Sequence, residues 1–217
     1  VNCQGVNVAP RQRVTKEMIV AEARRLVAEH GPAALTFQAL ASVLGVSKQA
    51  IIYWYPSKRE LARDFCLPLL REERDVVTSA MAETGSAGEA IEAFVRSLVR
   101  YHLSDLGRFR VLYLWLQFEP AVSLRPGDEH LLDPIHEATS SSYDILEAKI
   151  AADTSFLGNG NARKLAVAVD MAALGLITMI AMAEAMNDPW RHSTDSMVDA
   201  LVDLLTGKHR SGDRETA

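Results

Sequence analysis

The chain has 217 residues, 48% of them hydrophobic, which is enough length and apolar content for one or two buried cores. No alternating run of β-branched residues is long enough to require a sheet, and two cysteines, Cys3 and Cys66, disfavour a disulfide framework. We therefore expect an all-α protein of the reducing cytoplasm, without a signal peptide.

The net charge of −5 is unevenly distributed along the chain. Residues 1–63 carry nine Lys and Arg against four Asp and Glu, whereas residues 64–217 carry fourteen against twenty-four. Because attraction to phosphate is local, the basic N-terminal part is suited to nucleic acid, and the acidic remainder discourages contact with it.

Residues 1–13 lack periodicity and read either as a solvated tail or as an arm that reaches phosphates or a minor groove. The first helix is predicted from an N-cap at Thr15 to Gly31, with Pro32 blocking its continuation. Its buried face follows helical spacing and consists of Ile19, Ala23, Leu26 and Val27.

The next stretch, Phe37 to Tyr55, has the pattern of a helix-turn-helix. Gly45 suits a left-handed residue that ends one helix, and Ser47 suits the N-cap of the next. Ala41 is small where the two helix backbones approach. The side chains expected to form the shared core are Leu40, Leu44, Val46, Ile51 and Trp54. The recognition helix is predicted at residues 47–55.

Pro56 ends that helix, and Ser57 with Glu60 then forms a predicted capping box for a linking helix over residues 58–83. Pro68 lies inside this helix and should kink it, because proline lacks one backbone donor. The kink is either a tolerated bend or the point where ligand binding changes the spacing of two DNA-reading domains.

Residues 15–65 contain the Gly31 break, Thr36, Gly45-Val46-Ser47 and Pro56-Ser57-Lys58. With these features, the segment resembles the N-terminal domain of the TetR family of transcriptional regulators. The resemblance implies a three-helix DNA-binding domain over residues 1–60. It also implies a larger helical domain for ligand binding and dimerisation over residues 61–217, about nine helices in all.

This sequence departs from the family at two positions of the recognition helix. Ile52 stands where members usually carry a tyrosine that touches phosphate, so Tyr53 or Tyr55 would have to replace that contact. Gln49 stands where members often carry glycine, and glutamine can hydrogen-bond an adenine edge. We therefore expect a different target sequence.

The predicted DNA contacts fall into two groups. Side chains on the exposed side of the recognition helix are Lys48, Gln49 and Tyr53; residues at helix starts, where backbone N–H groups favour phosphate, are Thr36, Ser47 and Lys58. Thr36 and Ser47 could alternatively serve only as caps.

Five further helices are predicted at residues 89–103, 108–118, 133–152, 162–186 and 194–205. The last two are similar to the pair through which family members dimerise. Their predicted interface residues are Ala172, Gly175, Met197, Leu201 and Leu204, although these residues could instead pack within one subunit.

The most membrane-like stretch, Leu165 to Met186, is interrupted by Asp170 and Glu184. Its uncharged part is too short to span a bilayer, so we expect an interface helix and no membrane partner.

Aromatic residues and methionines concentrate between residue 101 and residue 182, which is typical either of a ligand pocket or of an ordinary helical core. The candidate pocket residues are Tyr101, His102, Phe109, Tyr113, Phe118, Met171 and Met179.

Catalytic chemistry has little support in the sequence. His130, Asp133 and His136 come nearest to a metal-binding pattern, but a solvated helix start explains them better, and we expect no cofactor, metal or catalytic residue. The sequence favours a homodimeric regulator, most simply a repressor, that a small-molecule effector releases from a palindromic double-stranded DNA operator. The alternatives are a DNA-binding protein of this fold controlled by a protein partner or by no ligand and, less favoured, an enzyme on a helical scaffold.

Overall fold

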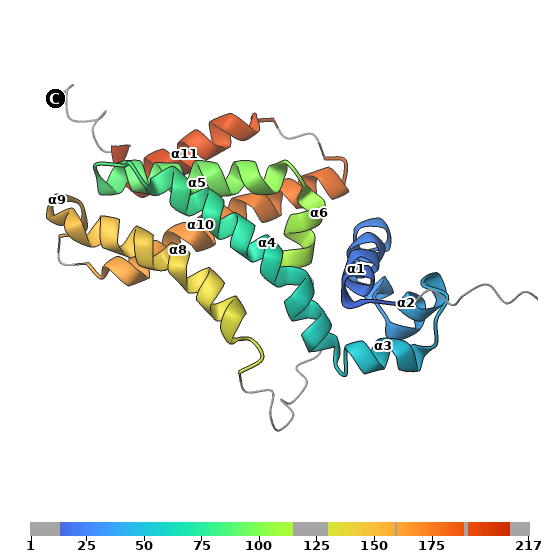
Figure 1. Ribbon diagram of the computed structural model, residues 1–217. Coiled ribbons are helices and arrows are strands. Elements are labelled where there is room, and N and C mark those ends of the chain that lie inside the picture. Colours follow the sequence, from blue (N-terminus) through green and yellow to red (C-terminus); the bar gives the residue numbers. More distant parts are fainter. Residues whose placement is uncertain (1–13, 115–129, 159, 189–190, 209–217) are drawn as a thin grey trace, which may run out of the picture. The chain divides into compact units, whose positions relative to one another are not determined.

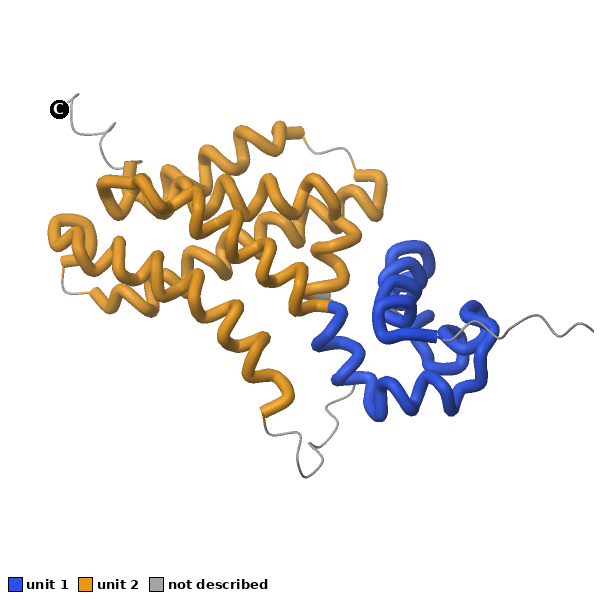
Figure 2. Tube along the Cα trace, in the orientation of Figure 1, with its two compact units in different colours: residues 1–65 blue, residues 66–217 orange. Residues whose placement is uncertain are grey.

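The computed structural model describes residues 14–114, 130–158, 160–188 and 191–208, and these residues form ten α-helices, two short helical turns and no strand (Figure 1). The chain divides into two compact units, the first ending at Phe65 and the second beginning at Cys66 (Figure 2). The division therefore falls five residues after the expected boundary.

The first unit contains three helices, a 3₁₀ turn and the start of a fourth helix. These elements are α1 (Lys16–His30), η1 (Pro32–Ala34), α2 (Phe37–Val43), α3 (Lys48–Trp54) and the beginning of α4 (Lys58–Met81). The 3₁₀ turn after Gly31 was not predicted.

Local side-chain caps start the first three helices, as the sequence predicts. The hydroxyl of Thr15 accepts from the N–H of Met18, that of Thr36 from Ala39, and that of Ser47 from Ala50, at 3.0 to 3.3 Å. Each cap satisfies one N–H that has no partner inside the helix. Gly45 has φ +65°, so the predicted left-handed turn between α2 and α3 is confirmed.

The predicted face of α1 is buried in full, together with Leu40, Ala41 and Ile51 from α2 and α3. Leu44, Val46 and Trp54 are half-buried. The guanidinium of Arg24 on α1 donates to the carbonyl of Phe65 at 3.2 Å and so ties α1 to α4. The helix-turn-helix is thus held against two supporting helices.

One half of the predicted capping box is present at the start of α4. The N–H of Glu60 donates to the Ser57 hydroxyl at 3.2 Å, and that hydroxyl donates to the Glu60 carboxylate at 3.2 Å. The helix runs through Pro68 to Met81 without a break in its assignment. A bend at Pro68 stays a prediction.

The second unit is a helical bundle built around α5. Its elements are the rest of α4, α5 (Ala87–Leu103), α6 (Leu106–Phe109), η2 (Arg110–Leu114), α8 (Asp133–Ala152), α9 (Thr154–Leu157), α10 (Ala162–Ala185) and α11 (Thr194–Thr206). Helix α5 packs against α8, α10 and α11 (Figure 1). The apolar core includes Ile91, Phe94, Leu98, Leu146, Val169, Ile177 and Val202.

The helices of the second unit differ from the prediction in two places. Asp105 caps α6 by accepting from the N–H of Arg108 at 3.1 Å, so this helix starts earlier than predicted and continues as a π-helical turn, η2. Helix α8 spans residues 133–152 as predicted, and the carboxylate of its first residue, Asp133, lies 2.7 Å from His130 Nδ1. Asp153 caps α9, a short helix that was not predicted.

Candidate functional site

The recognition helix α3 presents its predicted side chains to solvent. Lys48, Gln49 and Tyr53 are exposed, Tyr53 by 79%, whereas Ile51 on the opposite side of the helix is fully buried. Thr36, Ser47 and Lys58 are also exposed, at the starts of α2, α3 and α4. The first unit therefore offers a polar, partly basic surface on α3.

Tyr55 is not part of this surface, so its suggested role as a substitute phosphate contact is wrong. Its ring is buried, and its hydroxyl donates to Asp64 Oδ2 at 3.2 Å. Burial, together with the negative charge of Asp64, raises the pKa of the Tyr55 hydroxyl. The ammonium of Lys16 lies 3.9 Å from the same carboxylate. Of the two candidates, only Tyr53 can reach DNA.

The second unit contains a buried polar cluster, which we define as Glu73, His102, Tyr113, Tyr143 and Asp170. His102 is fully buried, and its Nε2 lies 2.9 Å from Glu73 Oε2. The hydroxyl of Tyr113 donates to Glu73 Oε1 at 2.7 Å, and that of Tyr143 donates to Asp170 Oδ2 at 3.0 Å. The cluster thus joins residues of α4, α5, η2, α8 and α10.

Burial governs the proton equilibria of this cluster. It raises the pKa of Asp170 to about 6, a rise to which the charge of Glu73 adds and which the Tyr143 hydrogen bond opposes. It also raises the pKa of Tyr113, helped by the carboxylates of Glu73 and Asp170. Burial and the charge of Asp170 likewise raise the pKa of Tyr143, so both phenols are protonated donors at neutral pH.

The structure brings together the rings of four of the predicted pocket residues. His102, Phe109 and Tyr113 have ring centroids 5.3 to 5.4 Å apart, and the Tyr101 ring centroid lies 5.1 Å from that of His102. Tyr101 turns its hydroxyl to the carbonyl of Leu69 and to Glu72, both at 3.1 Å, while the guanidinium of Arg108 covers its ring at 3.7 Å. Phe118 lies outside the described residues.

Met171 and Met179 do not join the cluster, because they lie on the exposed side of α10. Sequence reasoning in turn missed Glu73, Tyr143 and Asp170. Asp170 alone gave a signal, as a charged residue inside an otherwise apolar helix.

The raised pKa of Asp170 predicts a pH-dependent stability. An aspartate in the unfolded chain titrates near pH ~3.9, so the folded state holds the extra proton between about pH 4 and pH 6. The free energy of unfolding therefore falls as pH rises through this window and stays lower above it. We expect Asp170→Asn, which keeps an acceptor for Tyr143, to be more stable than wild type at pH 7.5 by about 1–3 kcal/mol.

Urea unfolding at pH 7.5 and pH 5.0 measures the free energy of unfolding of both proteins. The stability that Asp170→Asn gains over wild type should be smaller at pH 5.0. Glu184→Gln, an exposed change on the same helix, should show no such dependence. An Asp170→Asn protein less stable than wild type at both pH values would contradict the prediction.

The exposed face of α10 is a continuous apolar stripe at helical spacing. It consists of Met171, Gly175, Met179, Met182 and Met186, all exposed. The other side of the helix buries Val169, Ala173, Ile177 and Ala181 in the core. By length and composition alone α10 could cross a membrane, a test that a core or interface helix also passes. An exposed apolar surface of this kind is typical of an interaction face.

The other predicted interface residues differ from one another in exposure. Leu204 on α11 is exposed by 67%, whereas Ala172, Met197 and Leu201 are half-buried, and Leu201 packs against the core of its own unit. Gly175 and Leu204 are therefore the most accessible of the five.

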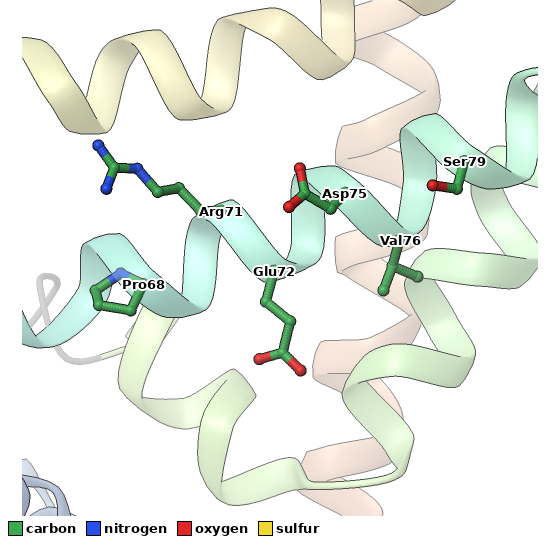
Figure 3. Close-up of a pocket in the computed structure, with 6 residues that line it drawn as sticks. All are labelled: Pro68, Arg71, Glu72, Asp75, Val76 and Ser79. Atoms are coloured by element: carbon green, nitrogen blue, oxygen red, sulfur yellow. The ribbon is translucent and has the colours of Figure 1, made fainter.

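An open depression of about 640 Å³ follows α4 from Pro68 to Ser79 (Figure 3). Its lining is mixed in charge, with Arg71 beside Glu72 and Asp75. It is open to solvent, whereas a small-molecule site is usually an enclosed cleft or cavity. Among the described residues, no group of three or more His, Cys, Asp or Glu could hold a metal ion.

Comparison with known proteins supports the assignment of the first unit. The family profile of the bacterial regulatory proteins, tetR family, matches residues 19–65. A search of curated protein sequences found no match.

Solved structures share the fold over nearly the whole chain. The fatty acid degradation regulator FadR from Bacillus halodurans has 16% identity and a TM-score of 0.65, over 93% of this chain and 97% of its own. FadR from Bacillus subtilis in complex with stearoyl-CoA has 14% identity and a TM-score of 0.65, over 88% and 98%. A tetR-family regulatory protein from Rhodococcus RHA1 has 18% identity and a TM-score of 0.61, over 92% and 97%.

These identities establish a common fold, and the profile match covers the helix-turn-helix itself. With its matched N-terminal domain and its two-unit helical fold, the chain is similar to the TetR family of transcriptional regulators.

Proposed function

We propose that this protein is a homodimeric repressor that binds a palindromic operator and is released from it by a small-molecule effector. The observation that carries the proposal is the exposed face of α3, where Lys48, Gln49 and Tyr53 stand opposite the buried Ile51. A helix anchored on one side and polar on the other is suited to the major groove.

The apolar stripe of α10 supports the second part of the proposal. One helix-turn-helix reads only a few base pairs, so useful affinity and specificity require two copies on a two-fold site. Pairing of α10 and α11 with the same helices of a second copy would cover the exposed methionines and Leu204.

The third part, an effector site in the second unit, is supported by the buried polar cluster and the aromatic rings around it. FadR from Bacillus subtilis was solved with stearoyl-CoA, so the same fold accommodates a small-molecule ligand in that protein.

Selection of bound fragments from genomic DNA tests the proposal as a whole. We expect the selected fragments to share an inverted repeat, and a metabolite to release the protein from it. Enrichment of no sequence over bulk DNA would refute a sequence-specific regulator. Operator binding that only a protein partner abolishes would refute the small-molecule effector.

Two substitutions should separate base reading from phosphate contact. Gln49→Ala is expected to change the preferred operator sequence, because glutamine can hydrogen-bond a base edge in the major groove. Lys58→Ala is expected to weaken all sequences similarly and to reduce the salt slope by about 1, because it removes one phosphate contact.

Binding of both variants to a library of operator mutants, at several salt concentrations, makes the measurement. An unchanged preference in the Gln49 variant would exclude direct reading by that residue.

A further inference from the structure

Each hydrogen-bond donor of the buried polar cluster already has an acceptor within the cluster. A phenol has a single O–H, and those of Tyr113 and Tyr143 go to Glu73 and Asp170. A carboxylate oxygen accepts, so His102 Nε2 carries the ring proton and donates it to Glu73. The atoms of the cluster that can still form hydrogen bonds are therefore acceptors.

His102 provides an independent sign that a donor is missing. Its side chain is fully buried, and its Nδ1 has no hydrogen-bond partner among the residues that the structure describes. In an imidazole that carries a single proton, on Nε2, the other nitrogen, Nδ1, is an acceptor. Buried acceptors are nearly always satisfied by protein, water or ligand, so this atom is suited to an incoming donor.

The cluster also contains more acidic than basic side chains, which likewise favours a ligand that donates hydrogen bonds. Glu73 and Asp170 face each other closely enough that the first raises the pKa of the second. His102 is the basic group bonded to Glu73, and Tyr143 is the hydrogen-bond partner of Asp170. Arg163 lies over the Tyr143 ring at 5.2 Å, but its guanidinium is paired with Asp144 and Glu147.

The surroundings favour a positive ligand rather than a neutral donor. Aromatic faces attract cations, and the cluster contains the rings of Tyr113 and Tyr143. Tyr113 also lies on the π-helical turn η2, a geometry found frequently at functional sites.

We propose that the buried polar cluster recognises the effector, and that the effector carries a protonated amine whose N–H groups bind Asp170 and the free acceptor of His102. The inference rests on the proposed function and adds the chemical class of the ligand. An ammonium group has three donors and no acceptor, which complements a site that has acceptors to spare. An effector whose buried end is a carboxylate would face two like charges.

Three probes of matched shape test the chemical class on the full-length protein: 4-phenylbutylamine, 4-phenylbutanol and 4-phenylbutanoate. At pH 7.5 we expect only the amine to raise the melting temperature and to give a dissociation constant by calorimetry. Its affinity should fall as pH is lowered through 6, because Asp170 then loses its charge. Stearoyl-CoA is added as a fourth probe because a structure of this fold holds it.

Asp170→Asn and Glu73→Gln preserve shape and test the site. We expect each to weaken amine binding by at least about tenfold, the scale of losing a buried charge partner. Glu184→Gln, which removes an exposed carboxylate from the same helix, should bind the amine like wild type.

No advantage of the amine over the alcohol, including the case in which neither binds, would overturn the inference. Tighter binding of the carboxylate or of stearoyl-CoA, or an amine affinity unchanged in Asp170→Asn, would also overturn it. Operator binding is scored on the same preparations. A protein that binds its operator but shows no amine preference refutes the ligand class and leaves the regulator intact.

Discussion

Replacing Gly175 by arginine is expected to convert the protein into a monomer and to reduce operator affinity by about 100-fold or more, since two linked readers gain at least that much from avidity. A Cβ atom added at Gly175 would meet no heavy atom within 4 Å outside the backbone of its own helix, and the position is exposed, so a single subunit should accept the arginine. Arginine is also a better helix former than glycine. In the proposed dimer, however, the charge would be buried among the methionines of α10.

Light scattering and operator titration measure the two consequences together. Ala151→Arg, a small-to-large change at another exposed position, on α8, is the matched control and should remain dimeric. If the Gly175 variant stays dimeric with normal operator affinity, the α10 stripe is not the interface.

Truncating Ile51 to alanine is expected to destabilise the first unit by about 2–5 kcal/mol, the usual range for emptying a buried aliphatic site. Ile51 is fully buried, and the unit around it is small, so DNA binding should be lost with the fold. Tyr53→Ala, two residues away on the exposed side of α3, should change stability by no more than about 0.5 kcal/mol. It should nevertheless weaken operator binding.

Urea unfolding and operator titration of the Ile51 and Tyr53 variants distinguish a residue that stabilises the fold from one that contacts DNA. An Ile51 variant as stable as wild type would place the core of the first unit elsewhere. A Tyr53 variant with unchanged operator affinity would remove that side chain from the reading surface.

The features that the sequence predicted well depend on contacts between near neighbours. Thr15, Thr36 and Ser47 each bond an N–H three residues ahead, and Gly45 needs only its own backbone angle. Such signals survive in any fold that contains the segment, which is why the helix-turn-helix could be placed to within a residue or two.

The polar cluster could not be predicted because it depends on distant pairings. His102 meets Glu73 across 29 residues, and Tyr143 meets Asp170 across 27. No local sequence pattern predicts either contact. Helix α10 posed a different difficulty. Both of its faces are apolar, so periodicity could not assign Met171 and Met179 to the inside or the outside.

Helix α8 differs from the other long helices whose first residues are described. Side chains cap α1, α5, α10 and α11, but the residue before α8 is Leu132, which has no side-chain cap. The second residue of α8, Pro134, has no amide hydrogen to protect. The first turn of α8 should therefore open at low free energy, and the amides of Ile135 and His136 should exchange with deuterium earlier than those that begin α5 or α10. Limited proteolysis should likewise cut this turn first, a local weakness next to a stable core.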